Sequence, residues 1–135
     1  MSDTVVEARW AGALRFEAVG RGGVPVTVDS GGDSGPSPTE SLLIGLATCM
    51  GVDVVDILTK MRIEPTGLTV RVEGDRRSEP PRWFTAIRLT YEVEGVPESE
   101  ASKLQRAVDL SRDKYCSVLH TLRPDIDLTI GIESG

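Results

Sequence analysis

A single long helical pattern limits the folds that are open to this chain. The pattern begins at Pro38 and continues to about Arg62, where a proline and a glycine soon stop it. Ser37 is a suitable N-cap, and Glu40 three residues later completes a capping box with it. A helix of this length would be roughly 36 Å long, and it is too apolar to lie on a protein surface. The sequence therefore predicts a central helix on which the other elements pack.

The faces of this helix differ in composition. At about 100° per residue, most of the apolar side chains gather on one broad face. That face consists of Leu43, Ala47, Met50, Val54, Ile57, Leu58 and Met61, and Ile44 and Val55 widen it. The narrow stripe that remains carries Cys49, Asp53, Asp56 and Lys60. Cys49 is therefore expected on the polar edge of the helix, one turn before Asp53.

Short strand patterns precede and follow the helix. Alternating residues indicate strands near 5–10, 14–19, 24–28, 68–73, 83–93 and 126–132, and further helices near 97–110 and 116–122. In the longest strand, the odd-numbered residues from Trp83 to Val93 are expected on one face. The Gly- and Ser-rich segment 30–38 is expected to form a flexible rim. The order β-β-β-α-β-β-α-α-β predicts an α+β fold with a mostly antiparallel sheet, as a single domain of residues 1–135.

Composition argues against several classes of protein. The chain has 135 residues and a formal net charge of −6, which argues against binding to nucleic acids or anionic membranes. Its uninterrupted apolar runs are only a few residues long, so no membrane span is expected. The N-terminus MSDTVVEARW lacks the charged and then apolar pattern of an export signal, so a cytoplasmic location is expected.

The chain has two cysteines, Cys49 and Cys116, and one histidine, His120. Two cysteines in a chain of this length do not make a secreted disulfide framework, and their spacing is unlike that of zinc ligands, so no metal or cofactor is expected. Each can be a small buried hydrophobic residue. If the two thiols met in the fold, they would form a reversible redox couple. The spacing leaves both interpretations open, and His120 is expected to be structural.

A reactive Cys49 would have to be a thiolate, because the thiolate is the nucleophilic form. The Asp53 carboxylate one turn later disfavours that negative charge. A thiolate at Cys49 therefore requires a cation from another part of the fold. Arg15, Arg21 and Arg82 are the candidates, because each follows or flanks a strand pattern.

Both cysteine segments resemble the OsmC/Ohr family, which comprises osmotically inducible protein C and the organic hydroperoxide resistance proteins. The segment GPSPTESLLIGLATCMGVDVVDIL is similar to the central-helix motif of the family, with a Pro-x-Glu start, small residues before the cysteine and a following Asp-Val-Val. The segment KYCSVLHTL is similar to its second-cysteine motif. The order of elements fits along nearly the whole chain, and the details resemble the OsmC-like branch more closely than the hydroperoxide resistance branch.

The resemblance implies a fold, an assembly and an activity. Members of the family form an intertwined homodimer, with two central helices packed back to back, six-stranded sheets outside them and the active site at the dimer interface. They reduce organic hydroperoxides and hydrogen peroxide with thiols alone, so no cofactor is implied. The implied partners are a second copy of the chain, a hydroperoxide substrate and a dithiol reductant, and neither nucleic acid nor a membrane.

The resemblance also implies roles for particular residues. Cys49 would be the peroxidatic thiol that becomes a sulfenic acid, and Cys116 would be the resolving thiol that closes the disulfide. The family holds the thiolate with an arginine and a glutamate. Arg15 is the preferred arginine, while the position of the glutamate falls on Thr39 and leaves the adjacent Glu40 as the carboxylate.

Two other functions are compatible with the same fold. One is a non-catalytic OsmC-like dimer that binds a small apolar ligand in its interface pocket. The other is a structural protein whose thiols are only packed. The presence of two cysteines in the family's arrangement favours the peroxidase, and the behaviour of a Cys49→Ser variant distinguishes it from the binding protein.

Overall fold

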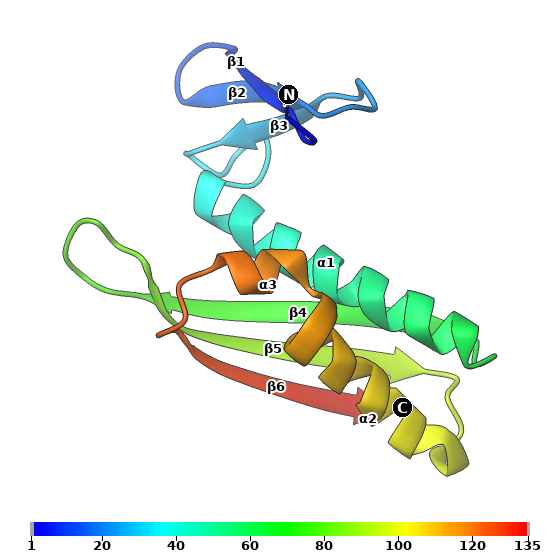
Figure 1. Cartoon of the computed structure of the whole chain (residues 1–135). Coiled ribbons are helices and arrows are strands. Elements are labelled where there is room, and N and C mark those ends of the chain that lie inside the picture. The colour runs from blue at the N-terminus through cyan, green and yellow to red at the C-terminus, as the bar shows by residue number, and fades with distance from the viewer. Residues whose placement is uncertain (1, 135) are drawn as a thin grey trace. The chain divides into compact units, whose positions relative to one another are not determined.

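The computed structural model describes residues 2–134, and its elements follow the predicted order (Figure 1). The strands are β1 (Glu7–Trp10), β2 (Arg15–Val19), β3 (Val26–Asp29), β4 (Gly67–Arg76), β5 (Phe84–Glu94) and β6 (Asp127–Ser134). The helices are α1 (Pro38–Lys60), α2 (Ala101–Leu110) and α3 (Ser117–Thr121), with a 3-10 helix at Glu98–Glu100 and a π-helical turn at Ser111–Tyr115. The predicted α+β class is confirmed. The chain divides into two compact units, residues 1–42 and residues 43–135.

In the first unit, β1, β2 and β3 form an antiparallel sheet. The register pairs Trp10 with Phe16, Phe16 with Val28 and Ala18 with Val26, so these residues share one face of the sheet. This apolar face is open in the single chain, with Trp10 67% and Val26 59% exposed. The opposite face is polar and includes a hydrogen bond of 2.7 Å from Thr27 to Glu17.

The loop after β3 is organised by Asp29. Its carboxylate accepts hydrogen bonds from the backbone N–H of Gly31 at 2.9 Å and of Ser34 at 3.0 Å, and these bonds lower the pKa of Asp29. A Cβ at Gly35 would collide with the Thr27 carbonyl, which explains a glycine at that position. The segment predicted as a rim is therefore hydrogen-bonded to the end of β3.

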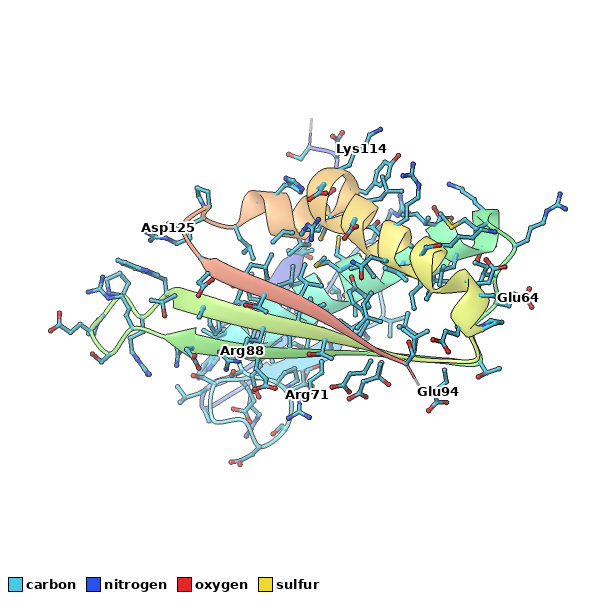
Figure 2. The ribbon with its side chains drawn as sticks, turned by 90° about the horizontal axis from the view of Figure 1, so that it is seen from below. Glu64, Arg71, Arg88, Glu94, Lys114 and Asp125 are labelled. Atoms are coloured by element: carbon cyan, nitrogen blue, oxygen red, sulfur yellow. The ribbon has the colours of Figure 1, made fainter. Side chains whose placement is uncertain are left out.

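In the second unit, β4, β5 and β6 form a sheet in which β4 and β5 are antiparallel and β5 and β6 are parallel. The helices of this unit cover one face of the sheet (Figure 2). The other face is polar, and Arg71 and Arg88 lie on it with ion pairs to Glu73 and Asp75. One face of this sheet thus belongs to the core and the other to solvent.

The core of the second unit lies between this sheet and the helices. Its buried apolar members are Leu46, Met50, Val54, Leu58, Ile63, Phe84, Ile87, Leu89, Tyr91, Val93, Leu104, Ala107, Val108 and Cys116. The predicted alternation in β5 holds from Ile87 to Val93 but is wrong at its start, where Phe84 is buried and Thr85 is exposed. The register shifts there, between Asp75 and Arg76, and such an irregularity reverses the faces of the residues before it.

The buried face of α1 is narrower than predicted. Leu46, Met50, Val54 and Leu58 are completely buried, whereas Ile44 is 49% and Val55 45% exposed. The predicted face omitted Leu46, which is in the core, although at about 100° per residue Leu46 lies about 60° from Leu43, as far as Leu58 does on the other side. The reason for the narrow buried face is geometric, because one side of a helix packs on a sheet along a narrow row of residues four apart.

The prediction that no segment could cross a membrane took account only of uninterrupted apolar runs. By length and composition alone, α1 is apolar enough to do so, although its longest uninterrupted apolar runs are short. Packing in the protein offers another explanation for the apolar composition of α1. One side of α1 enters the core of the second unit, and side chains on its other sides are exposed in the single chain.

Candidate active site

Helix α1 carries the first half of the site. Cys49 and Asp53 are four residues apart, so their side chains lie on the same side of consecutive turns. Both side chains are half-buried, and Cys49 packs against the edge of the core. The predicted position of Cys49 beside Asp53 is confirmed.

The π-helical turn carries the second half. In this turn the backbone N–H of Cys116 donates to the carbonyl of Ser111 at 2.9 Å, five residues earlier in the chain. The wider turn leaves Cys116 as the N-cap of α3, where its Sγ accepts a hydrogen bond of 3.3 Å from the N–H of Leu119. Single π-helical turns of this kind occur frequently at functional sites.

The two halves meet on one side of α1. The Sγ atoms of Cys49 and Cys116 and a carboxylate oxygen of Asp53 all lie within 4.8 Å of one another. Both cysteines are free thiols. The sequence left open whether the two thiols meet, and the tertiary structure brings them together. Ser111 completes the cluster, because its hydroxyl donates to Asp53 Oδ2 at 2.8 Å.

The two thiols differ in their surroundings. Cys116 is fully buried, whereas Cys49 is partly exposed. Burial raises the pKa of Cys116 to about 11, and contact with Cys49 and the charge of Asp53 add to this shift, although the Leu119 N–H opposes it. Cys116 is therefore a protonated thiol at neutral pH.

Tyr91 lies beside this cluster on β5. Its side chain is completely buried, and burial raises its pKa while the nearby Ser111 hydroxyl opposes that shift. Within residues 2–134, the Tyr91 hydroxyl nevertheless makes no hydrogen bond of acceptable geometry. Ser111 and Tyr91 were not identified from the sequence, since neither belongs to a motif and a π-helical turn has no sequence pattern of its own.

Two further site residues were predicted, Arg15 and Glu40. Both belong to the first unit, where Arg15 lies opposite Asp29 in the register of β2 and β3. Glu40 forms the predicted capping box, since its carboxylate accepts from the Ser37 N–H at 2.9 Å while its own N–H donates to Ser37 Oγ at 3.2 Å. These hydrogen bonds lower the pKa of Glu40.

His120 and Arg82 have structural contacts in the second unit. The Nε2 atom of His120 lies 2.9 Å from the carbonyl of Arg112, to which it donates, in agreement with a structural histidine. Arg82 Nε donates to the carbonyl of Arg77 at 3.2 Å within the loop between β4 and β5. Neither belongs to the thiol cluster as the described contacts define it.

A groove adjoins the cluster at Asp53. It has a volume of about 490 Å³ and is lined by Asp53, Asp56, Ile57, Lys60, Met61, Arg106, Leu110 and Tyr115. Its lining combines apolar side chains from α1 and α2 with two acidic side chains, Asp53 and Asp56, and two basic ones, Lys60 and Arg106. Such a lining can accommodate an organic molecule with an apolar body.

The same three donor atoms are close enough to one another to hold a metal ion. Thiolates are ligands that zinc favours. Cys49, Asp53 and Cys116 supply one protein ligand fewer than the four of a structural zinc site. That this chain needs no metal therefore stays a prediction.

Comparison with known proteins identifies the relatives of this chain. The family described as OsmC-like protein matches residues 31–131, which include both cysteines. Protein YhfA of Escherichia coli strain K12 is 37% identical over 126 residues, which cover 93% of this chain and 93% of that protein. A hypothetical protein from Aquifex aeolicus VF5 has a TM-score of 0.87 and 32% identity over 100% of this chain and 98% of its own.

More distant structures share the fold. The organic hydroperoxide resistance protein OhrB of Bacillus subtilis has a TM-score of 0.66 and 16% identity, over 98% of both chains. The lower likeness to this protein agrees with the expected OsmC-like branch. A family match across most of the chain, together with a relative of 37% identity, establishes the relationship. This chain belongs to the OsmC-like family.

Proposed function

We propose that this protein is a thiol-dependent peroxidase that reduces organic hydroperoxides, with Cys49 as the peroxidatic and Cys116 as the resolving thiol. The convergence of two free thiols from α1 and the π-helical turn carries this proposal. Their unequal exposure supports the assignment of roles. The partly exposed thiol meets the substrate first, and the fully buried one closes the disulfide.

The reaction has three steps. The Cys49 thiolate attacks the terminal oxygen of the hydroperoxide, the O–O bond breaks, and the departing alkoxide takes a proton to become an alcohol. Cys49 is then a sulfenic acid. Cys116 attacks its sulfur, the S–O bond breaks, and water and a disulfide are formed. A dithiol reductant returns the disulfide to two thiols. The groove beside Asp53 supports an organic substrate, because Ile57, Met61 and Leu110 line it.

In this proposal Arg15 is the guanidinium that stabilises the Cys49 thiolate, and Glu40 takes the place of the glutamate that the family uses beside that arginine. The resemblance to the family supports both assignments. The test compares Arg15→Ala with Arg21→Ala. The first is expected to slow the oxidation of Cys49, and the second is expected to leave its rate unchanged. Equal rates in both variants would remove Arg15 from the proposal.

The active form in this proposal is a homodimer, located in the cytoplasm. Two apolar surfaces of the single chain support the homodimer. The first is the open face of the β1–β2–β3 sheet, and the second is the exposed side of α1 with Ile44, Val52 and Val55. Beside the second lies a groove of about 550 Å³ between α1 and β4. Surfaces of this kind are covered in stable proteins.

Free-thiol titration and mass spectrometry under non-reducing conditions test the peroxidase. After one equivalent of an organic hydroperoxide, the wild type is expected to lose both thiols and about two hydrogens of mass. Cys116→Ser should gain one oxygen on Cys49, and Cys49→Ser should keep its remaining thiol. If both thiols of the folded wild type survive, the peroxidase is excluded and the dimer that binds an apolar ligand becomes the better explanation.

A further inference from the structure

None of the three steps of the proposed reaction uses the hydrogen bond between Ser111 and Asp53. It joins side chains 58 residues apart in the chain, and it holds a carboxylate beside both thiols. The Ser111 hydroxyl donates to only one carboxylate oxygen, Oδ2. A half-buried carboxylate disfavours a thiolate nearby, so this placement needs a compensating reason.

Disulfide formation requires two proton transfers, and this carboxylate can take part in both. Cys116 is fully buried and must lose its proton to attack, yet burial holds that proton strongly. At the same time, the oxygen of the sulfenic acid at Cys49 leaves poorly as hydroxide and needs a proton to leave as water. The proton that one sulfur must lose is the proton that the departing oxygen must gain.

We propose that Asp53 relays the proton of Cys116 to the departing oxygen of the Cys49 sulfenic acid while the disulfide forms. This role rests on the proposed function. A carboxylate oxygen of Asp53 lies within 4.8 Å of both sulfur atoms, so a small movement of its side chain reaches either partner. Ser111 is the positioning residue that orients the carboxylate.

The atoms and electrons of this step balance. A carboxylate oxygen of Asp53 takes the proton of the Cys116 thiol as the Cys116 sulfur attacks the Cys49 sulfur. The S–S bond forms with the electron pair of Cys116, and the S–O bond breaks with its pair on oxygen. The oxygen takes the proton from Asp53 and leaves as water, which returns Asp53 to a carboxylate. The organic hydroperoxide is the oxidant that produced the sulfenic acid.

The substitution Asp53→Asn isolates the relay. The amide has the shape of the carboxylate, and its oxygen can still accept from Ser111, but it cannot take up a proton at neutral pH. Oxidation of Cys49 by the hydroperoxide should be as fast as in the wild type or faster. Disulfide formation should then slow about 100-fold or more, the range of general acid–base catalysis. The sulfenic acid should accumulate and be trapped by a dimedone probe.

Three variants control the experiment. Asp75→Asn removes a carboxylate from the polar face of the β4–β5–β6 sheet, where it pairs with Arg88 at 2.9 Å, and it should leave both steps unchanged. Ser111→Ala should slow disulfide formation by roughly 10-fold, since it removes only the orienting hydrogen bond. Asp53→Glu should restore a large part of the rate, which a purely structural role would not predict.

A second reagent separates the two halves of the relay. Dithiobis(nitrobenzoate) converts Cys49 into a mixed disulfide, from which Cys116 releases an aromatic thiolate that leaves without a proton. Asp53→Asn should slow this release less than it slows closure from the sulfenic acid. Equal slowing in both reactions would overturn the relay, because it would leave Asp53 with no role at the departing oxygen.

The outcomes distinguish the relay from the peroxidase. If the wild type forms its disulfide and Asp53→Asn forms it at the same rate, the relay is wrong and the peroxidase stands. If hydroperoxide does not oxidise Cys49 in the wild type, the peroxidase itself is wrong and the relay has no substrate oxygen. If Asp53→Asn loses both steps together with its fold, Asp53→Glu and Ser111→Ala decide the question through the accumulation of sulfenic acid.

Discussion

Cys49 and Cys116 are the same type of residue, but their surroundings give them different chemistry. Cys49 extends from the edge of α1 and is partly exposed. Cys116 is fully buried at the N-cap of α3, where burial keeps its thiol protonated. One thiol is partly exposed and the other is buried, and such a pair suits a reaction in two stages.

The raised pKa of Cys116 predicts a loss of stability at alkaline pH. Below the ordinary thiol pKa of 9.0, the thiol is protonated in both states, so its contribution is complete. Between 9.0 and about 11, the unfolded thiol ionises while the folded one keeps its proton, and the contribution is lost as pH rises. Urea unfolding of the reduced wild type and of Cys116→Ala should show their difference shrinking through this range. A difference that does not change with pH would contradict the assignment.

The buried hydroxyl of Tyr91 predicts that Tyr91→Phe is tolerated. Within the described residues this hydroxyl has no hydrogen-bond partner, so its removal abolishes a desolvation cost without breaking a bond. The free energy of unfolding should be unchanged or about 1 kcal/mol higher. Tyr115→Phe, at an exposed tyrosine, serves as the control and should change little. A clear loss of stability in Tyr91→Phe would indicate a hydrogen bond to this hydroxyl.

At the scale of elements, two helical segments of different geometry form the cluster. In α1 a spacing of four residues aligns Cys49 with Asp53, and in the π-helical turn a spacing of five residues links Ser111 to Cys116. The bond from Ser111 to Asp53 then joins the two segments. Packing of α1 on the sheet keeps the first segment in place, because its buried row anchors it.

Leu46→Ala tests that anchoring. Leu46 is completely buried, so its truncation should lower the free energy of unfolding by about 2–5 kcal/mol. Ile44→Ala, at an exposed position of the same helix, should leave packing within the chain unchanged. Any loss of stability in Ile44→Ala should depend on protein concentration, as expected for a dimer interface. Chemical unfolding at two concentrations measures both effects.

At the scale of the whole molecule, the two sheets differ in the side chains that they expose in the single chain. The β4–β5–β6 sheet presents ion pairs on the face away from its helices. The β1–β2–β3 sheet presents Trp10, Phe16 and Val26 instead. An exposed apolar face of this kind marks an interaction surface. This contrast is the main structural support for the proposed dimer.

Val26→Glu should therefore weaken the dimer. It places a charge on the apolar face of the β1–β2–β3 sheet, where Val26 is 59% exposed in the single chain. Glu7→Lys changes charge on the opposite face of the same sheet and serves as the control. Sedimentation equilibrium should show a dimer for the wild type and for the control, and dissociation for Val26→Glu. A monomeric wild type would rule out the dimer.

Much of this architecture could be predicted from local sequence patterns. The capping box at Ser37 and Glu40 predicted the start of α1, and alternation predicted the strands. These features depend on residues close together in the chain, whose geometry is fixed by the local backbone. The placement of Cys49 next to Asp53 follows from helical spacing for the same reason.

Other features depended on contacts between distant residues. The contact between Cys49 and Cys116, and the bond from Ser111 to Asp53, join segments that no local pattern relates. The exposure of Ile44 and Val55 and the reversal of faces at Phe84 arose in the same way, from the line along which α1 meets the sheet and from a shifted strand register. Local spacing specifies which side chains share a face, but only the folded chain determines what that face meets.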